Sequence, residues 1–195
     1  KLLAMVDRAK SQDGIAVSHT TLDADPWLLN CLNGTIDLRT GVLRPHDPTD
    51  LITKRVNVSF DPDAQAPTWD AFLQRIMENN ADMIAFIQRA AGYTLTGDIS
   101  EQCLFFLYGD GSNGKTTFVQ ALCSIMGAFW QKSPTEMIMF QRNGNAIPND
   151  LAKLPGARMT VKGEISQGRR LDEGKVKDIT GGEPISARFM REEWF

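Results

Sequence analysis

The stretch GDGSNGKTT, at positions 109–117, combines residue types and spacing that could hold a phosphate group. The fixed positions of the pattern G-x-x-x-x-G-K-[ST] are filled by Gly109, Gly114, Lys115 and Thr116. Glycines let the backbone curl so that its N–H groups face phosphate oxygens, and the start of a helix adds partial positive charge. The stretch therefore predicts a nucleotide-binding loop.

The side chains of this loop suit a nucleoside triphosphate with its metal ion. The ammonium of Lys115 can reach the β and γ phosphates, and the hydroxyl of Thr116 can bind Mg²⁺. We therefore expect ATP and Mg²⁺ as cofactors. The expected nucleotide contacts are Gly109, Asp110, Gly111, Ser112, Asn113, Gly114, Lys115, Thr116 and Thr117.

The elements on either side of the loop must position it. The run QCLFFLYG, at 102–109, is continuously apolar and ends in glycine, which is typical of a strand buried on both faces of a parallel sheet. After the loop, apolar residues at helical spacing from Phe118 to Met126 predict a helix that ends at Gly127. Strand, loop and helix in this order form the context that a phosphate-binding loop requires.

Such a loop also needs an acid on a neighbouring strand to hold Mg²⁺ and polarise the attacking water. Glu164 fits this role, since it ends the short β-type stretch in GARMTVKGEIS. Asp172 and Glu173 remain alternatives for the same role.

The first hundred residues show a different pattern of apolar and polar residues. Two β-type runs at 35–38 and 42–44, separated by Arg39, Thr40 and Gly41, predict a hairpin. Apolar residues at helical spacing predict one helix over 69–77, capped by Thr68. They predict a second over 82–91, with Met83, Phe86, Ile87 and Ala90 inward and Gly92 at its end.

Composition narrows the class of protein. The chain has 195 residues, 42% of them hydrophobic, and a net charge of −3, which indicates a globular protein. Its three cysteines are widely spaced in apolar surroundings, as expected of reduced core thiols rather than metal ligands or disulfides. No run approaches the ~18 apolar residues of a membrane span, so we expect an intracellular protein without membrane contact. Residues 1–100 are net acidic and residues 151–191 net basic.

Four stretches of the chain, in the same order, are similar to signature stretches of a known family. They are NGTIDLRTGVLRPHDPTDLITKR, AAGYTLTGDISEQCLFFLYGDGSNGKTT, NDLAKLPGARM and KDITGGEPISAR. The family is the phage- and plasmid-type primase/helicases, which are superfamily 3 helicases related to the poxvirus primase-helicase. The resemblance covers nearly the whole chain.

The resemblance implies an α/β fold in two parts. Residues 1–100 would form a small α+β accessory domain. Residues 101–195 would form the N-terminal part of a P-loop, AAA+-like parallel-sheet ATPase core, truncated at its C-terminus before the sensor residue and arginine finger. It assigns Lys115 and Thr116 to the Walker A loop and Glu164 to the Walker B acid. Lys115 and Glu164 are then the expected catalytic residues, and Thr116 and Glu164 the expected metal ligands.

Further matches concern DNA. Lys177, Gly181 and Gly182 match the motif that distinguishes superfamily 3, and Arg188 follows where the family commonly has a basic residue. Lys177 and Arg188 are therefore our candidate DNA contacts. In this family six subunits form a homo-hexameric ring that grips one DNA strand at a fork. One departure is that Lys162 and Gly163 precede a single Glu164, where the family often has two acids.

Together these observations predict an ATP-dependent replicative DNA helicase of a phage, plasmid or prophage, acting in the cytoplasm of the bacterial host. A primase domain upstream in the same chain is left open. Three alternatives remain: an ATP-binding assembly or loading module without unwinding activity, a small-molecule kinase, and a GTPase-like switch. The last rests on the D-x-x-G pattern at 178–181 and lacks a guanine-reading N-K-x-D element.

Overall fold

The computed structural model of the chain describes residues 2–12, 14–133, 135–140, 151, 154–163 and 168–182. The helices are α1 (Leu2–Ala9), α2 (Pro67–Ile76), α3 (Ala81–Leu95), α4 (Lys115–Met126) and α5 (Glu173–Thr180). The strands are β1 (Leu28–Cys31), β2 (Gly34–Asp37), β3 (Val42–Arg44), β4 (Trp130–Lys132) and β5 (Met159–Val161). Short 3-10 turns are η1 (His19–Thr21), η2 (Pro48–Asp50), η3 (Gly127–Phe129) and η4 (Thr135–Ile138). No helix in the described ranges is long and apolar enough to cross a membrane.

The N-terminal part contains a three-stranded antiparallel sheet in the order β1-β2-β3. The predicted hairpin is confirmed as β2 and β3, with Ile36 opposite Leu43. Gly41 adopts φ +72°, and its N–H donates to the carbonyl of Asp37 over 2.7 Å, so the turn uses a conformation that glycine adopts at little cost. Strand β1, which the sequence analysis did not predict, pairs with β2 and places Leu29 opposite Ile36.

Both helices predicted after the hairpin exist, but their ends differ from the prediction. Helix α2 begins at Pro67 after Ala66, so Thr68 lies inside the first turn rather than at the cap; proline suits the first position because it has no N–H to leave unpaired. Helix α3 continues through Gly92 to Leu95, because one glycine costs only about 1 kcal/mol in a helix. Asn80 caps it by accepting a hydrogen bond from the N–H of Met83.

The inward face predicted for α3 is wrong in part. Met83 and Phe86 are 44% and 48% exposed, and no residue of α3 is buried. The ring of Phe86 meets the ring of Phe105 edge-on, with centroids 6.5 Å apart. The apolar stripe of α3 is therefore only partly covered.

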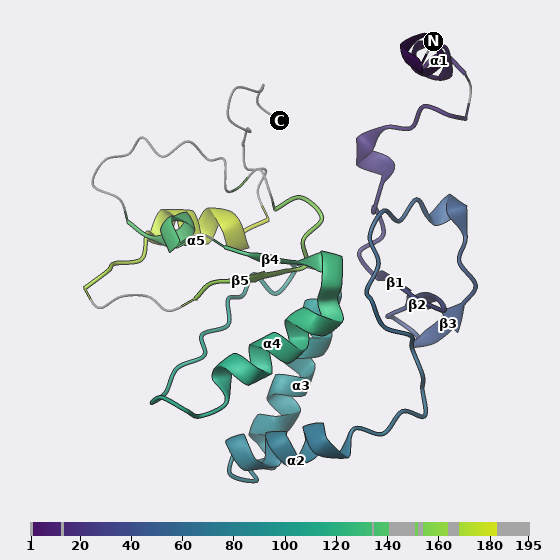
Figure 1. The fold of residues 1–195 in the computed structure, drawn as a ribbon. Coiled ribbons are helices and arrows are strands. Elements are labelled where there is room, and N and C mark those ends of the chain that lie inside the picture. The colour runs from purple at the N-terminus through teal and green to yellow at the C-terminus, as the bar shows by residue number, and fades with distance from the viewer. Residues whose placement is uncertain are drawn as a thin grey trace.

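The part of the chain after the loop is a mixed α/β unit. Helix α4 begins at Lys115, directly after the loop, and Gly127 caps its end, where the sequence predicted that the helix would stop. Strands β4 and β5 then pair in parallel, with Trp130 opposite Met159. Figure 1 shows α2, α3 and α4 on one side of this pair and α5 on the other. The class is α/β, and the parallel sheet has two strands in the described residues.

The strand predicted over 102–109 does not form. Residues 103–108 have no regular secondary structure, and their large side chains are exposed, from 41% for Phe105 to 91% for Tyr108. A strand needs a neighbour that takes its backbone hydrogen bonds. Strands β4 and β5 pair with each other instead, and no described strand pairs with this segment.

The main core joins segments that are far apart in the sequence. Leu29 and Ile36 from the three-stranded sheet pack in one buried cluster with Met126 and Phe129, which follow the loop. Arg158 adds polar links. Its guanidinium donates to the carbonyls of Leu28 and Leu95, over 2.7 Å each, and lies 4.6 Å from the ring centre of Phe129. Residues on both sides of position 100 therefore share one core. The boundary at that position stays a prediction.

Candidate nucleotide-binding loop

The loop over 109–114 is shaped by residues in left-handed backbone conformations. Gly109, Ser112 and Gly114 have φ values of +138°, +61° and +84°. Gly114 is also the residue that caps the start of α4. Because these angles are accessible to glycine at little cost, two of the three bends depend on the glycines at the fixed positions of the motif.

The ammonium of Lys115 folds back into this loop. It donates to the carbonyls of Gly109 and Asp110, over 2.9 and 3.0 Å, and to Oδ1 of Asn113 over 2.7 Å. The side chain is half-buried in this position. The geometry brings a positive charge to the mouth of the loop, next to the backbone that the motif predicts to contact phosphate.

The start of α4 suits an anion. No side chain caps this helix, and the intrahelical hydrogen bonds begin with the N–H of Phe118 donating to the carbonyl of Gly114. The N–H groups of the first turn therefore have no partner within the helix. Unpaired donors, the helix dipole and the Lys115 charge meet at one point, so the residues present fit a nucleotide phosphate.

Helix α2 packs against the loop and against helix α4. A Cβ on Gly114 would lie 2.6 Å from Cγ2 of Ile76 and 3.2 Å from Cε2 of Phe72. The ring of Trp69 stacks on that of Phe118, with centroids 5.7 Å apart. Gly114 is thus constrained twice, by its own φ and by its contact with α2. These contacts were not predicted, because spacing within α2 shows that the helix has an apolar face but not what covers it.

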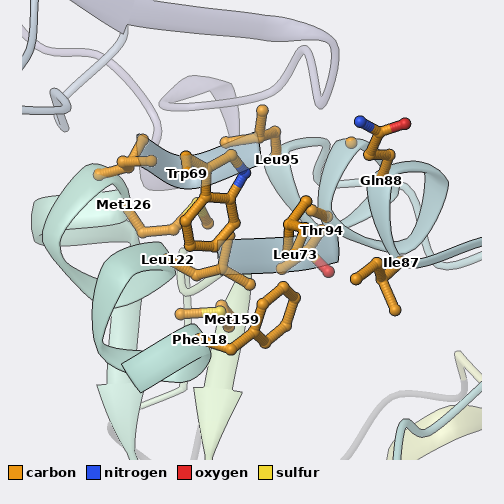
Figure 2. Close-up of a pocket in the computed structure, with 13 residues that line it drawn as sticks. Trp69, Leu73, Ile87, Gln88, Thr94, Leu95, Phe118, Leu122, Met126 and Met159 are labelled. Atoms are coloured by element: carbon orange, nitrogen blue, oxygen red, sulfur yellow. The ribbon is translucent and has the colours of Figure 1, made fainter. Parts of the chain in front are cut away.

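An apolar cavity of about 320 Å³ lies behind the loop helix, between α2, α3, α4 and β5 (Figure 2). Its walls are apolar apart from Gln88 and Thr94. Its lining residues are Trp69, Leu73, Ile87, Gln88, Ala91, Gly92, Thr94, Leu95, Phe118, Leu122, Ile125, Met126 and Met159. The apolar faces of these elements therefore leave a pocket between them.

The structure bears on the expected acid only through the strand before it and the alternative carboxylates. Glu164 and Arg188 lie outside the described residues. Strand β5 ends at Val161, so the β-type stretch predicted before Glu164 is a strand. Of the alternatives, Asp172 is engaged as the cap of α5, where its carboxylate accepts a hydrogen bond from the N–H of Lys175 over 3.2 Å. Glu173 is exposed in the first turn of the same helix.

The remaining candidates lie on or near α5. Lys177 is exposed in its last turn, and within the described part of the chain no ion pair is found for it. Gly181 caps the helix through its N–H, which donates to the carbonyl of Lys177 over 2.7 Å. The carbonyl of Gly181 accepts a hydrogen bond from Nε2 of Gln102. The end of α5 thus contacts the segment that leads into the loop.

The three cysteines differ in their surroundings. Cys31 is buried and Cys123, on α4, is half-buried; burial raises the pKa of both thiols. Cys103 is exposed, unlike the core position expected for it, because the segment that carries it is not part of a sheet.

Comparisons with known proteins relate the chain to viral proteins that are named as helicases. Residues 2–78 match the family described as D5 N terminal like. The chain is 26% identical over 177 residues to "Putative helicase L207/L206" of Acanthamoeba polyphaga mimivirus, a match that covers 88% of this chain and 18% of that protein. It is 22% identical over 174 residues to "Putative helicase 121R" of Invertebrate iridescent virus 3, covering 86% and 18%.

The chain thus spans about a fifth of the length of these relatives. Both matches run through most of the chain, including residues beyond the family match. At a coarse level, the similarity is to helicases of the D5-like type. Helix α2 belongs to the region that the family description covers, and this same helix contacts Gly114 of the loop.

Proposed function

We propose that this chain is part of an ATP-dependent DNA helicase, with residues 109–117 as its ATP-binding loop. The observation that carries the proposal is the Lys115 ammonium held at the mouth of the loop, where α4 begins without a side-chain cap. The names of the two relatives support the same activity. More specifically, we propose that this helicase is a replicative helicase of superfamily 3.

In this proposal the residues of the chain bind and orient a nucleotide. The N–H groups of the first turn of α4 hold the phosphate oxygens, and Lys115 neutralises their charge. Thr116 and Glu164 would hold Mg²⁺, and Glu164 would accept a proton from the attacking water. Bound Mg²⁺–ATP supplies the phosphoryl group that is transferred to water.

Coupling to DNA requires neighbouring subunits and basic contacts. A homo-hexameric ring would let one subunit complete the site of the next, so that hydrolysis changes the geometry between subunits. Lys177 and Arg188 would contact phosphates of single-stranded DNA, and such contacts are independent of sequence and weaken with salt. The exposed position of Lys177 on α5 is consistent with this role.

The first test is ATP hydrolysis by the full-length protein, with and without single-stranded DNA, over a salt series. A DNA-gripping motor should be stimulated strongly, and the stimulation should fade as salt rises. A rate of ATP hydrolysis that does not change when DNA is added would contradict the motor and favour an assembly module. Turnover that depends on a small phosphate acceptor would favour a kinase.

The loop assignment has its own test. Lys115→Ala should weaken ATP binding and abolish turnover, because it removes the charge that faces the phosphates. Arg8→Ala, which alters an exposed residue of α1, serves as the matched control and should leave both unchanged. Normal ATP binding by Lys115→Ala would overturn the proposed site.

A further inference from the structure

Every N–H donor of the Lys115 ammonium is hydrogen-bonded in this structure. A lysine ammonium carries three N–H donors. All three find an acceptor, in the carbonyls of Gly109 and Asp110 and in Oδ1 of Asn113, at 2.9, 3.0 and 2.7 Å. A phosphate oxygen can approach this ammonium closely only if one of the three acceptors leaves.

The three acceptors differ in how easily they leave. Two are main-chain carbonyls of the loop, so moving them would change the backbone that shapes the site. The third is the side-chain amide of Asn113, which can rotate about its own bonds without moving the loop. Asn113 is exposed, so rotation would turn its amide toward water.

The first glycine of the motif makes room for this amide. A Cβ on Gly109 would lie 2.4 Å from Nδ2 of Asn113 and 3.8 Å from Nζ of Lys115. Only a residue without a side chain allows the amide to lie across the loop at this point. The contact between Asn113 and Lys115 therefore depends on the shape of the loop and on the absence of a side chain at Gly109.

We propose that Asn113 is a positioning residue that holds the third proton of the Lys115 ammonium until a nucleotide phosphate replaces it. The inference rests on the proposed function of the loop. It adds that the Asn113 side chain competes with the nucleotide phosphate for the Lys115 ammonium. The exchange favours the ligand, because a hydrogen bond from an ammonium to an anionic oxygen is stronger than one to a neutral amide. The carbonyls of Gly109 and Asp110 keep the lysine in place during the exchange.

The competitor predicts an unusual gain of affinity. In Asn113→Ala the ammonium loses one internal partner, so Mg²⁺–ATP should bind about five-fold more tightly, the factor for one net hydrogen bond of about 1 kcal/mol. A residue that only shaped the loop would lower the affinity when removed. Asn113→Asp should bind more weakly than the unaltered protein, because a carboxylate holds the ammonium more firmly and repels phosphate.

The experiment is isothermal titration of Mg²⁺–ATP into the full-length protein and its variants. Asn57→Ala, which alters an exposed asparagine outside the loop, is the matched control and should leave the Kd unchanged. Thermal unfolding of each variant shows whether it is folded. An Asn113→Ala protein with an unchanged or higher Kd would overturn the role of Asn113.

The outcomes separate this inference from the proposed function. If Lys115→Ala loses ATP binding but Asn113→Ala does not bind ATP more tightly, the ATP site is supported and the role of Asn113 is refuted. If Lys115→Ala binds ATP normally, the site itself is wrong. Should Asn113→Ala fail to fold, Asn113→Asp decides: a Kd no higher than that of the unaltered protein would overturn the inference.

Discussion

The indole of Trp69 stacks on the ring of Phe118, with centroids 5.7 Å apart and planes inclined by 17°. Trp69 lies in α2, inside the region that matches D5 N terminal like proteins, and Phe118 lies one turn into the loop helix α4. With the contact of Gly114 on Ile76, this stack makes α2 the support of the candidate loop. Helix α2 of the matched region therefore packs against the loop and its helix.

The stack predicts energetic coupling between the two helices. Trp69→Ala should lower the free energy of unfolding by about 2 kcal/mol, since the indole is half-buried, and Phe118→Ala by a similar amount. The double variant should lose less than the sum by about 1 kcal/mol, because the ring pair can be lost only once. Urea unfolding of the four proteins measures this. Additive losses would show that the rings are not coupled.

Gly114→Ala should disturb the loop for two reasons. The residue has φ +84°, which costs a residue with a side chain about 1–2 kcal/mol, and the new Cβ would lie 2.6 Å from Ile76. We expect a loss of stability of about 2 kcal/mol or more and weaker ATP binding. Adding Ile76→Ala should recover the part due to crowding but not the part due to φ. Unfolding curves and ATP titration check this, and unaltered binding by Gly114→Ala would contradict it.

The acid is tested by comparing two carboxylates. Glu164→Gln should leave ATP binding largely intact while stopping hydrolysis, because the amide can neither accept the proton nor hold Mg²⁺ as well. Asp172→Asn should instead leave hydrolysis in place and reduce stability by less than about 1 kcal/mol, since asparagine also caps helices well. Single-turnover hydrolysis assays distinguish the two. The reverse pattern would move the catalytic role to Asp172.

Arg158→Met should destabilise the protein. The guanidinium links β1 to the end of α3 through the carbonyls of Leu28 and Leu95, and burial lowers its pKa. Methionine fills the space of the stem but leaves both carbonyls without this donor, at a net cost of about 2 kcal/mol. Arg55→Met, at an exposed position, should change stability by about 0.5 kcal/mol or less. Equal effects of the two substitutions in denaturant unfolding would refute the role of Arg158.

Stability should fall at acid pH through Asp25. Burial alone would raise the pKa of this carboxyl, but hydrogen bonds from Arg39 and from the N–H of Trp27, and the charge of Arg39, outweigh it and lower the pKa below its ordinary 3.8. The contribution is therefore present above pH 3.8 and is lost as pH falls through the lower, folded-state value.

Arg39→Ala should make this acid dependence shallower, since Asp25 then titrates closer to its ordinary pKa. The two side chains are 46% and 38% exposed, so salt should also weaken the effect. Unfolding midpoints from neutral pH down to about pH 3 measure the slope. An identical slope in Arg39→Ala would show that the pair does not contribute. Arg8→Ala is the control and should keep the original slope.

The elements that the sequence predicted correctly depend on local interactions. The β2–β3 hairpin follows from Gly41, whose positive φ closes the turn between two β-type runs. Helix α4 follows from the spacing of its apolar residues, and Gly127 caps its end, as the sequence indicated. Turn angles and helix hydrogen bonds join residues within a few positions of one another, so a short stretch contains most of the information.

The predictions that were wrong concern partners far along the chain. The apolar run at 103–108 resembles a buried strand, yet its side chains are exposed, because an apolar run cannot specify which strand will take its hydrogen bonds. The same reason explains the exposed Met83 and Phe86 on α3. Strand β1 was missed because its four residues carry no alternation that marks a strand.

For the candidate site, the sequence alone determined the loop, its lysine and the helix that follows, since these are fixed by residue types at set spacing. Only the tertiary structure decided that α2 lies against Gly114 and that the Asn113 amide lies over Gly109 with Oδ1 on Lys115. The first contact joins residues 38 positions apart, and the second depends on a side-chain rotation. Packing and hydrogen bonding decide both contacts. The loop adopts a shape in which the Lys115 ammonium has hydrogen-bond acceptors and the glycines leave room for neighbouring atoms.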